Sequence, residues 1–197
     1  MSPSAVGGRG NEQGATLVEV LITMVILITG LLGLVALQAR LQIAQIEAYQ
    51  RAQAAVLLAD ISERMLANRI GVGEYVTNGP IGTGSNCATL TAAGTRTQSD
   101  VREWCDLLQG ASTTLSGAQV GTLTNGRGCV EAIVAGSLYR VAVVWQGLAP
   151  IGGPDDGAAI TSTTCGNGLY DGAAGTPCTA DLCRRELVST VRIARLL

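Results

Sequence analysis

A long apolar run with a single acid near its start is the feature that most constrains this chain. Residues 15–37 include only one charged side chain, that of Glu19. At about 1.5 Å per residue, a helix over this run is roughly 34 Å long, which is enough to cross a bilayer with some tilt. A carboxylate inside a membrane span costs about 2.5–3.5 kcal/mol or more, so an acid at such a position usually has a function. We therefore expect a transmembrane helix in which Glu19 has a specific role.

A removable secretory signal is the alternative explanation of the run, and the sequence disfavours it. Such a signal has a basic first region, an apolar core of about 7–15 residues and a cleavage site with small residues after the core. Here Arg9 is offset by Glu12, the apolar run is too long, and Leu37 stands where a small residue is needed. Gly14 instead ends a short polar leader, which suggests a cleavage site on the N-terminal side of the span.

The orientation of the span is indicated by the cysteines rather than by the flanking charges. Arg40 and Arg51 follow the run, so the positive-inside rule does not favour a cytoplasmic N-terminus. All the cysteines follow the run as well, and an even number on one side of a span is typical of disulfide bonds in an oxidising compartment. The six are Cys87, Cys105, Cys129, Cys165, Cys178 and Cys183. We therefore expect a single-pass protein whose C-terminal domain lies outside the cytoplasm.

The sequence leaves the disulfide pairing open, because six cysteines allow fifteen pairings. We expect Cys87 to pair with Cys105, and the remaining four cysteines to form the other bonds. A zinc site at the three most C-terminal cysteines and buried free thiols are alternatives. The chain has no histidine, and an exported protein favours disulfides over zinc, so we expect neither a metal nor another cofactor.

Composition argues against catalysis and against nucleic acid as a partner. The net charge is −2, which provides no general attraction to phosphates. The lack of histidine removes the commonest general base, and no paired acids or nucleophile motif stand at a diagnostic spacing. We therefore expect a protein that is not an enzyme. A group of arginines has the right charge for DNA, but a solvated strand face is the simpler interpretation. They are Arg184, Arg185, Arg192 and Arg195.

The helix is expected to continue beyond the membrane. Residues 38–69 contain no proline or glycine and are rich in strong helix formers, so one helix of about 55 residues is predicted. Gly71 follows its last turn, as a C′ glycine does. A stripe of mostly small residues at helical spacing is the expected contact face. It comprises Leu41, Ala44, Ala48, Ala52, Ala55, Leu58, Ser62 and Met65.

The rest of the chain is predicted to form a small mixed domain, which makes the fold class α+β. Residues 71–98 are expected to be a loop, followed by a helix from Asp100 that buries Val101, Trp104, Cys105 and Leu108. Strands are predicted over residues 129–134, 138–145 and 186–195, and residues 135–137 form a hairpin turn between the first two. Asp-Gly segments at residues 155–157 and 167–172 carry oxygen ligands for calcium, but turn formation explains them better.

These elements divide the chain into four expected parts. Residues 1–14 form a leader, residues 15–37 the transmembrane half of the helix, and residues 38–70 its amphipathic half. Residues 71–197 form a disulfide-bonded globular domain.

The stretch Gly14-Ala15-Thr16-Leu17-Val18-Glu19, followed by an apolar helix, resembles the class III signal of type IV pilins and pseudopilins. The family usually has an aromatic residue after the glycine, where this chain has Ala15. Dispersed segments are similar to PilV-type minor pilins in particular. They are residues 28–34, 37–40, 127–130, 139–141, 144–147 and 183–188.

The resemblance implies a pilin-like fold, with the long helix packed on a small antiparallel sheet, and a set of processing steps. A prepilin peptidase cleaves after Gly14 on the cytoplasmic side and methylates the new N-terminus at Ala15. Glu19 then pairs with the terminal amine of a neighbouring subunit during assembly.

The function implied is that of a minor pilin that primes, assembles or caps a type IV pilus, supporting twitching motility and adhesion. Its partners would be other minor and major pilins, the pilus assembly platform and a tip adhesin. It would be anchored in the inner membrane with a periplasmic domain, and join the fimbrium after assembly. A pseudopilin of a type II secretion system and a DNA- or ligand-binding tip subunit are the alternatives.

Overall fold

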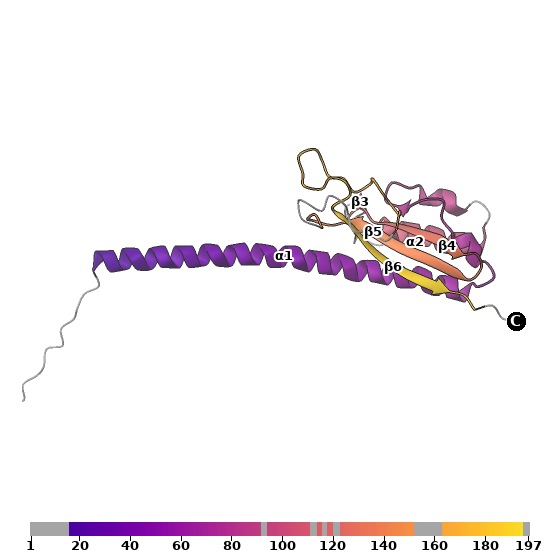
Figure 1. Cartoon of the computed structure of the whole chain (residues 1–197), viewed down its shortest axis with the longest axis horizontal. Coiled ribbons are helices and arrows are strands. Elements are labelled where there is room, and N and C mark those ends of the chain that lie inside the picture. Colours follow the sequence, from indigo (N-terminus) through magenta and orange to yellow (C-terminus); the bar gives the residue numbers. More distant parts are fainter. Residues whose placement is uncertain are drawn as a thin grey trace, which may run out of the picture. The chain divides into compact units, whose positions relative to one another are not determined.

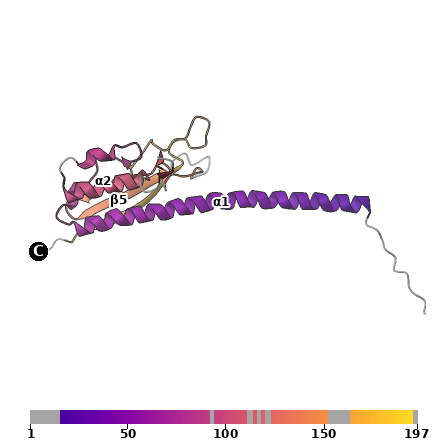
Figure 2. The same ribbon diagram turned by 180° about the vertical axis from the view of Figure 1, so that it is seen from behind.

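The computed structural model describes residues 16–91, 94–110, 114–115, 118–119, 123–151 and 163–194. The chain divides into two compact units, Met1–Ala44 and Gln45–Leu197. The elements of the second unit are shown in Figures 1 and 2.

The first helix, α1, spans Leu17–Ala67 and contains 51 residues. The long N-terminal helix predicted from the sequence is therefore present. Its end differs from the prediction: the Asn68 N–H still bonds to the Arg64 carbonyl, but the Asn68 side chain donates to Thr97 Oγ1 at 2.9 Å. Gly71 has φ −90° and precedes a short 3₁₀ helix, so it is not a C′ glycine. A tertiary contact, rather than a glycine cap, marks the end of α1.

The buried face of α1 is not the predicted small-residue stripe. The residues it buries are Gln50, Ala54, Leu57, Leu58, Ile61 and Met65. Of the predicted stripe, only Leu58 and Met65 are among them. The face that contains Leu57 and Ile61 carries more apolar surface than the alanine face, so burying it gains more hydrophobic free energy.

The sheet of the second unit has four strands in the order β1-β4-β5-β6, and every neighbouring pair is antiparallel. The strands are β1 (Ile81–Gly82), β4 (Arg127–Val134), β5 (Leu138–Gln146) and β6 (Arg184–Arg192). The predicted α+β class and the three predicted strands are confirmed. The strand bounds differ from the prediction by at most two residues, except that β6 ends three residues earlier than expected. A separate two-stranded sheet pairs β2 (Thr114–Leu115) with β3 (Ala118–Gln119).

The hairpin between β4 and β5 turns at residues 135–137 as predicted, with Gly136 at φ 75°. The positive φ explains the glycine, because other residues adopt this conformation only at a cost.

Both faces of the sheet are covered, so β5 is buried on both sides. On one face, Val141 and Val143 belong to the main core, which includes residues of α1 and α2. On the other face, Ala142 and Val144 pack with Tyr170 and the Cys129 and Cys165 side chains. The sheet therefore lies between a helical layer and a disulfide-bonded loop over residues 163–183. Alternating residues along β5 supply the two cores, as the two-residue period of a strand requires.

The second helix, α2, spans Arg96–Leu108 and begins earlier than the predicted Asp100. Thr95 is its N-cap, and the Thr95 hydroxyl accepts a hydrogen bond from the Gln98 N–H at 3.3 Å. The predicted buried residues of this helix, Val101, Trp104, Cys105 and Leu108, are all buried.

The segment predicted as a loop before α2 contains three short elements. They are η1 (Val72–Tyr75), β1 and η2 (Cys87–Thr91). Each has at most five residues, which is too short for a repeating pattern of apolar residues to predict it from the sequence.

Candidate functional site

The N-terminal part of α1 is the largest exposed apolar surface that the structure describes. Every residue from 16 to 46 is exposed in the isolated chain, and an 18-residue window of α1 has a mean hydropathy of 2.8. From Leu17 to Leu37, apolar side chains lie on all sides of the helix, so no polar face is left for water in that part. By length and composition, α1 can span a membrane.

Glu19 lies in the first turn of α1. The Glu19 N–H donates to Thr16 Oγ1 at 3.3 Å, and the Val20 N–H donates to the Thr16 carbonyl at 3.2 Å. Thr16 thus caps the helix, and Thr16-Leu17-Val18-Glu19 matches the Thr-x-x-Glu capping box. Within the described part of the chain, Glu19 has no ion-pair partner. An acid in the first turn is also stabilised by the positive end of the helix dipole.

Two threonines inside the apolar segment bond to their own helix. Thr23 donates to the Val20 carbonyl at 2.8 Å, and Thr29 donates to the Val25 and Ile26 carbonyls at 3.0 and 2.9 Å. Internal partners of this kind remove the cost of placing hydroxyls in hydrocarbon. These threonines therefore do not oppose a membrane position.

Gly14 and Ala15, the predicted cleavage and methylation positions, lie outside the described residues.

A charged cluster joins α1 to α2 inside the second unit. The Arg64 guanidinium contacts Asp60 at 3.0 Å, Asp100 at 3.3 Å and Glu103 at 2.7 Å. The hydrogen bond to Glu103 is the main cause that raises the pKa of Arg64, and the same bond lowers the pKa of Glu103. Tyr75 extends the cluster by donating to Asp100 Oδ2 at 2.5 Å. Arg64 and Asp100 are both partly buried, whereas Glu103 is exposed, so solvent screens the Arg64–Asp100 pair least.

Trp104 adds a neutral contact between the same two helices. It is fully buried, and its indole N–H donates to the Leu57 carbonyl at 3.0 Å. Trp104 is therefore buried as predicted, and its polar N–H has a partner inside the core.

Arg185 of β6 forms an ion pair with α1 near the start of the second unit. One Arg185 nitrogen contacts Glu47 Oε1 at 2.9 Å and the Ala149 carbonyl at 2.8 Å. Close by in sequence, Gln50 is buried and donates to Thr124 Oγ1 at 2.9 Å. Gly147 leaves room for the Arg185 guanidinium, since a Cβ there would lie 2.6 Å from its central carbon.

The six cysteines form three disulfide bonds, as expected of the group. Cys87 pairs with Cys105, which is the predicted pairing. The other two bonds are Cys129–Cys165 and Cys178–Cys183. All six side chains are more than nine-tenths buried.

Arg184 holds the loop that covers the second face of the sheet. Its side chain is buried, donates to the carbonyls of Thr163 and Cys165 at 2.9 and 3.0 Å, and contacts Glu186 at 3.2 Å. A buried arginine paired in this way cannot contact DNA phosphates. Because Arg185 is also engaged internally, two of the four arginines considered for DNA are not available to it; Arg192 is exposed and Arg195 lies outside the described residues.

The described residues contain no group of three or more His, Cys, Asp or Glu side chains that can hold a metal ion. Asp171 instead accepts the Asp181 N–H at 2.8 Å, and Asp181 accepts the N–H of Tyr170 at 3.1 Å. These bonds match the turn interpretation of residues 167–172. Residues 155–157 lie outside the described part of the chain.

The sequence analysis did not identify Arg64 as a residue that joins the layers. It placed Arg184 and Arg185 on a solvated strand face, which is wrong, because Arg184 is buried and Arg185 is bonded to Glu47 of α1. None of the three stands in a motif that indicates its partners, and only the tertiary arrangement brings the acidic or carbonyl partners near. Comparisons of the chain with protein-family models, with curated proteins and with solved structures found no match.

Proposed function

We propose that this chain is a non-enzymatic subunit of a membrane-anchored filament, most like a minor pilin of a type IV pilus. The observation that carries the proposal is an exposed, all-round apolar helix with one acid in its first turn. A helix without a polar face needs lipid or other apolar helices around it. The folded domain at its other end would then lie outside the cytoplasm, where its disulfides form and persist.

The acid supplies the specificity of assembly in this proposal. In a layer of packed apolar helices, Glu19 is costly alone and is stabilised by a cation at the same depth. The amine that processing at Gly14 creates on Ala15 of a neighbouring subunit is such a cation. Glu19 therefore favours an assembled helix over an isolated one and sets the register between neighbours.

A local role in the helix cap is the competing explanation of Glu19, and one pair of variants separates the two. Glutamine at this position keeps the capping box but removes the charge. We expect both Glu19→Ala and Glu19→Gln to insert in the membrane normally and to be absent from sheared filaments. Membrane fractionation and immunoblotting of the filament fraction measure both properties.

Glu63→Gln is the matched control, because Glu63 is exposed and lies far along the same helix. It should be incorporated like the wild type. Normal incorporation of Glu19→Gln would show that the acid acts only as a cap and would defeat the proposal.

A pseudopilin of a secretion system shares every N-terminal feature used here. Deletion of the gene distinguishes the two, with surface filaments and twitching scored beside secretion of exoproteins. Lost secretion with intact filaments would replace the minor-pilin assignment by the pseudopilin one.

A further inference from the structure

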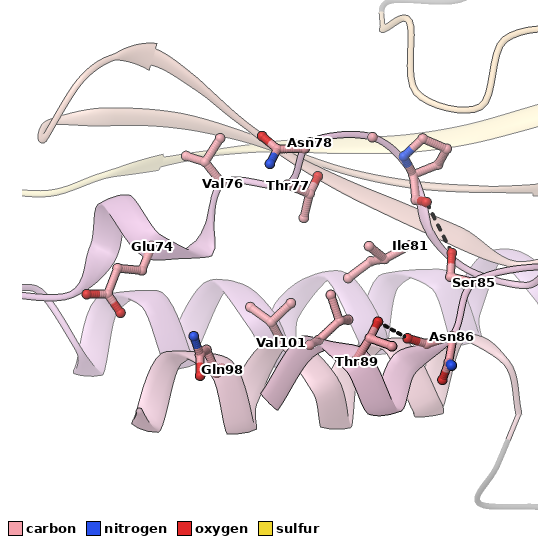
Figure 3. A pocket seen from close by; sticks show the side chains of 13 residues that line it. Glu74, Val76, Thr77, Asn78, Ile81, Ser85, Asn86, Thr89, Gln98 and Val101 are labelled. Carbon is pink, nitrogen blue, oxygen red and sulfur yellow. Dashed lines mark hydrogen bonds between the residues drawn. The ribbon is translucent and has the colours of Figure 1, made fainter. Parts of the chain in front are cut away.

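A pocket of about 370 Å³ opens on the second unit, away from the residues used above for assembly. The segment from Val76 to Ile81 lies on one side of it, and η2 with the first half of α2 lies on the other (Figure 3). This volume is near the lower limit for small-molecule sites, so it suits one small ligand or one amino-acid side chain.

The floor of the pocket is apolar. Ile81 and Val101 are buried and approach from opposite sides (Figure 3), and Leu90 and Val76 complete the apolar lining. An aliphatic group placed here would cover surface that is otherwise wet, at a gain of about 25 cal/mol for each Å² removed from water.

Among the described residues that line the pocket, Glu74 is the one that carries a charge. Glu74 lies at one end of the pocket, and Ser85 and Asn86 lie at the other (Figure 3). None of the described residues that line the pocket is basic. The arginines of α2 are directed elsewhere, since Arg96 and Arg102 face Asp100 and Asp106 at 4.0 and 3.8 Å.

Of the three hydroxyls that line the pocket, that of Thr77 accepts the Val130 N–H at 3.2 Å and keeps its proton, whereas the other two present only acceptors. Thr89 Oγ1 donates its proton to the Asn86 carbonyl at 2.7 Å, and Ser85 Oγ donates to the Pro80 carbonyl at 3.3 Å. Because each of these two hydroxyls has one proton, only lone pairs remain for a ligand. Together with Glu74, these oxygens favour a ligand rich in N–H donors and positive in charge.

We propose that this pocket binds a primary ammonium or guanidinium group on an aliphatic stem, with the charge at Glu74 and the stem on Ile81, Leu90 and Val101. Two sources carry this chemistry, a free alkyl diamine and the Lys or Arg side chain of a partner protein. The inference does not depend on the proposed filament role, and its failure would leave that role unchanged.

The test uses the full chain in detergent micelles, with methyl NMR signals of the pocket residues as the readout. The probes are 1,5-diaminopentane, N-acetyl-lysine amide and, as the neutral polyol comparison, methyl glucoside. We expect both amines to shift the Val76, Ile81, Leu90 and Val101 methyls in the millimolar range, and the glucoside to leave them unchanged. The tighter of the two amines identifies the source, since the lysine derivative reproduces a partner's side chain.

Glu74→Gln should weaken amine binding about fivefold, the upper end for an exposed ion pair. Glu74 is exposed, so this variant should keep the fold, which its unchanged distant methyl signals would verify. Glu63→Gln removes the same charge outside the pocket and should bind amines like the wild type. Added salt should weaken binding to the wild type more than to Glu74→Gln. Equal amine affinity of Glu74→Gln and wild type, or shifts produced by the glucoside but not by the amines, would overturn the proposal.

Discussion

Single residues in this domain are constrained mainly by what packs directly against them. Gly128 of β4 shows this most clearly, because its missing side chain makes room for the Trp104 ring. A Cβ at Gly128 would lie 2.7 Å from Trp104 Cζ2 and 2.9 Å from Leu108 Cδ1. Both neighbours are fully buried, so neither can move aside freely.

Gly128→Ala should therefore lower the free energy of unfolding by about 1–3 kcal/mol, as overpacking a core does. Thermal unfolding of the full chain in detergent, followed by near-UV circular dichroism, measures the change. Gly73→Ala is the control, since a Cβ there meets only the Tyr139 hydroxyl at 3.9 Å. Equal melting temperatures of the two variants would contradict this account of Gly128.

Tyr75 is expected to make the stability of the domain depend on pH. Burial is the main cause that raises the pKa of Tyr75 to about 12, and its hydrogen bond to Asp100 adds to the effect. The unfolded chain releases the phenolic proton near pH 10, before the folded one does. The stabilisation by neutral Tyr75 is thus complete below pH 10 and is lost as the pH rises from 10 to 12.

Tyr75→Phe should be less stable than the wild type at neutral pH by about 1.5 kcal/mol, because the bond to Asp100 is lost. It should also lose less stability than the wild type between pH 10 and 12. Urea unfolding across this pH range tests both statements. Tyr49→Phe alters an exposed tyrosine and should show the wild-type dependence. Parallel pH curves for wild type and Tyr75→Phe would refute the assignment.

At the scale of elements, the features that could be predicted from the sequence are those that a local repeating pattern of residues determines. The long helix, the buried face of α2 and the β4–β5 hairpin follow from repeating patterns of apolar residues and from one turn glycine. The buried face of α1 was predicted wrongly, because several faces of that helix are apolar enough to pack. The pocket could not be predicted at all, since Glu74, Thr89 and Val101 come together only through the tertiary fold.

The disulfides stabilise elements to different extents. Cys129–Cys165 joins residues 36 apart and fixes the covering loop to the sheet, whereas Cys178–Cys183 joins residues only 5 apart. Since closing a longer loop restricts the unfolded chain more, replacing the first pair by alanine should cost about 1–2 kcal/mol more than replacing the second. Guanidinium unfolding of the two double variants gives this difference. The reverse order would mean that strain or residual structure outweighs loop length.

At the scale of the whole molecule, two kinds of surface are built on one continuous helix. The α1 residues 17–46 are exposed, and they are apolar up to Leu37, whereas one face of the helix between Gln50 and Met65 belongs to the core of a folded domain. No turn or glycine-rich linker separates the two uses. The helix changes from a fully exposed apolar segment to a segment that packs in the domain core only through its side chains.

Membrane insertion should depend on the first of these surfaces. Leu27→Arg combined with Leu31→Arg adds about 6 kcal/mol to the insertion free energy, since each central arginine costs roughly 3 kcal/mol. This variant should move from the alkaline-extracted membrane pellet to the soluble or aggregated fraction. The same double change at Leu41 and Gln45 lies beyond the apolar run and should leave the protein in the pellet. Retention of both variants would argue against a span over residues 15–37.

The shared helix also imposes an order on biosynthesis. Leu57, Ile61 and Met65 are synthesised early, yet the sheet that covers them is complete only when β6 has been made, more than 120 residues later. At about 5–20 residues per second, the growing chain leaves the core around this apolar face incomplete for several seconds. During that interval the nascent protein is a client for any holding chaperone. A chain that ends before β6 would lack the strand that pairs with β5 and would leave that edge of the sheet open.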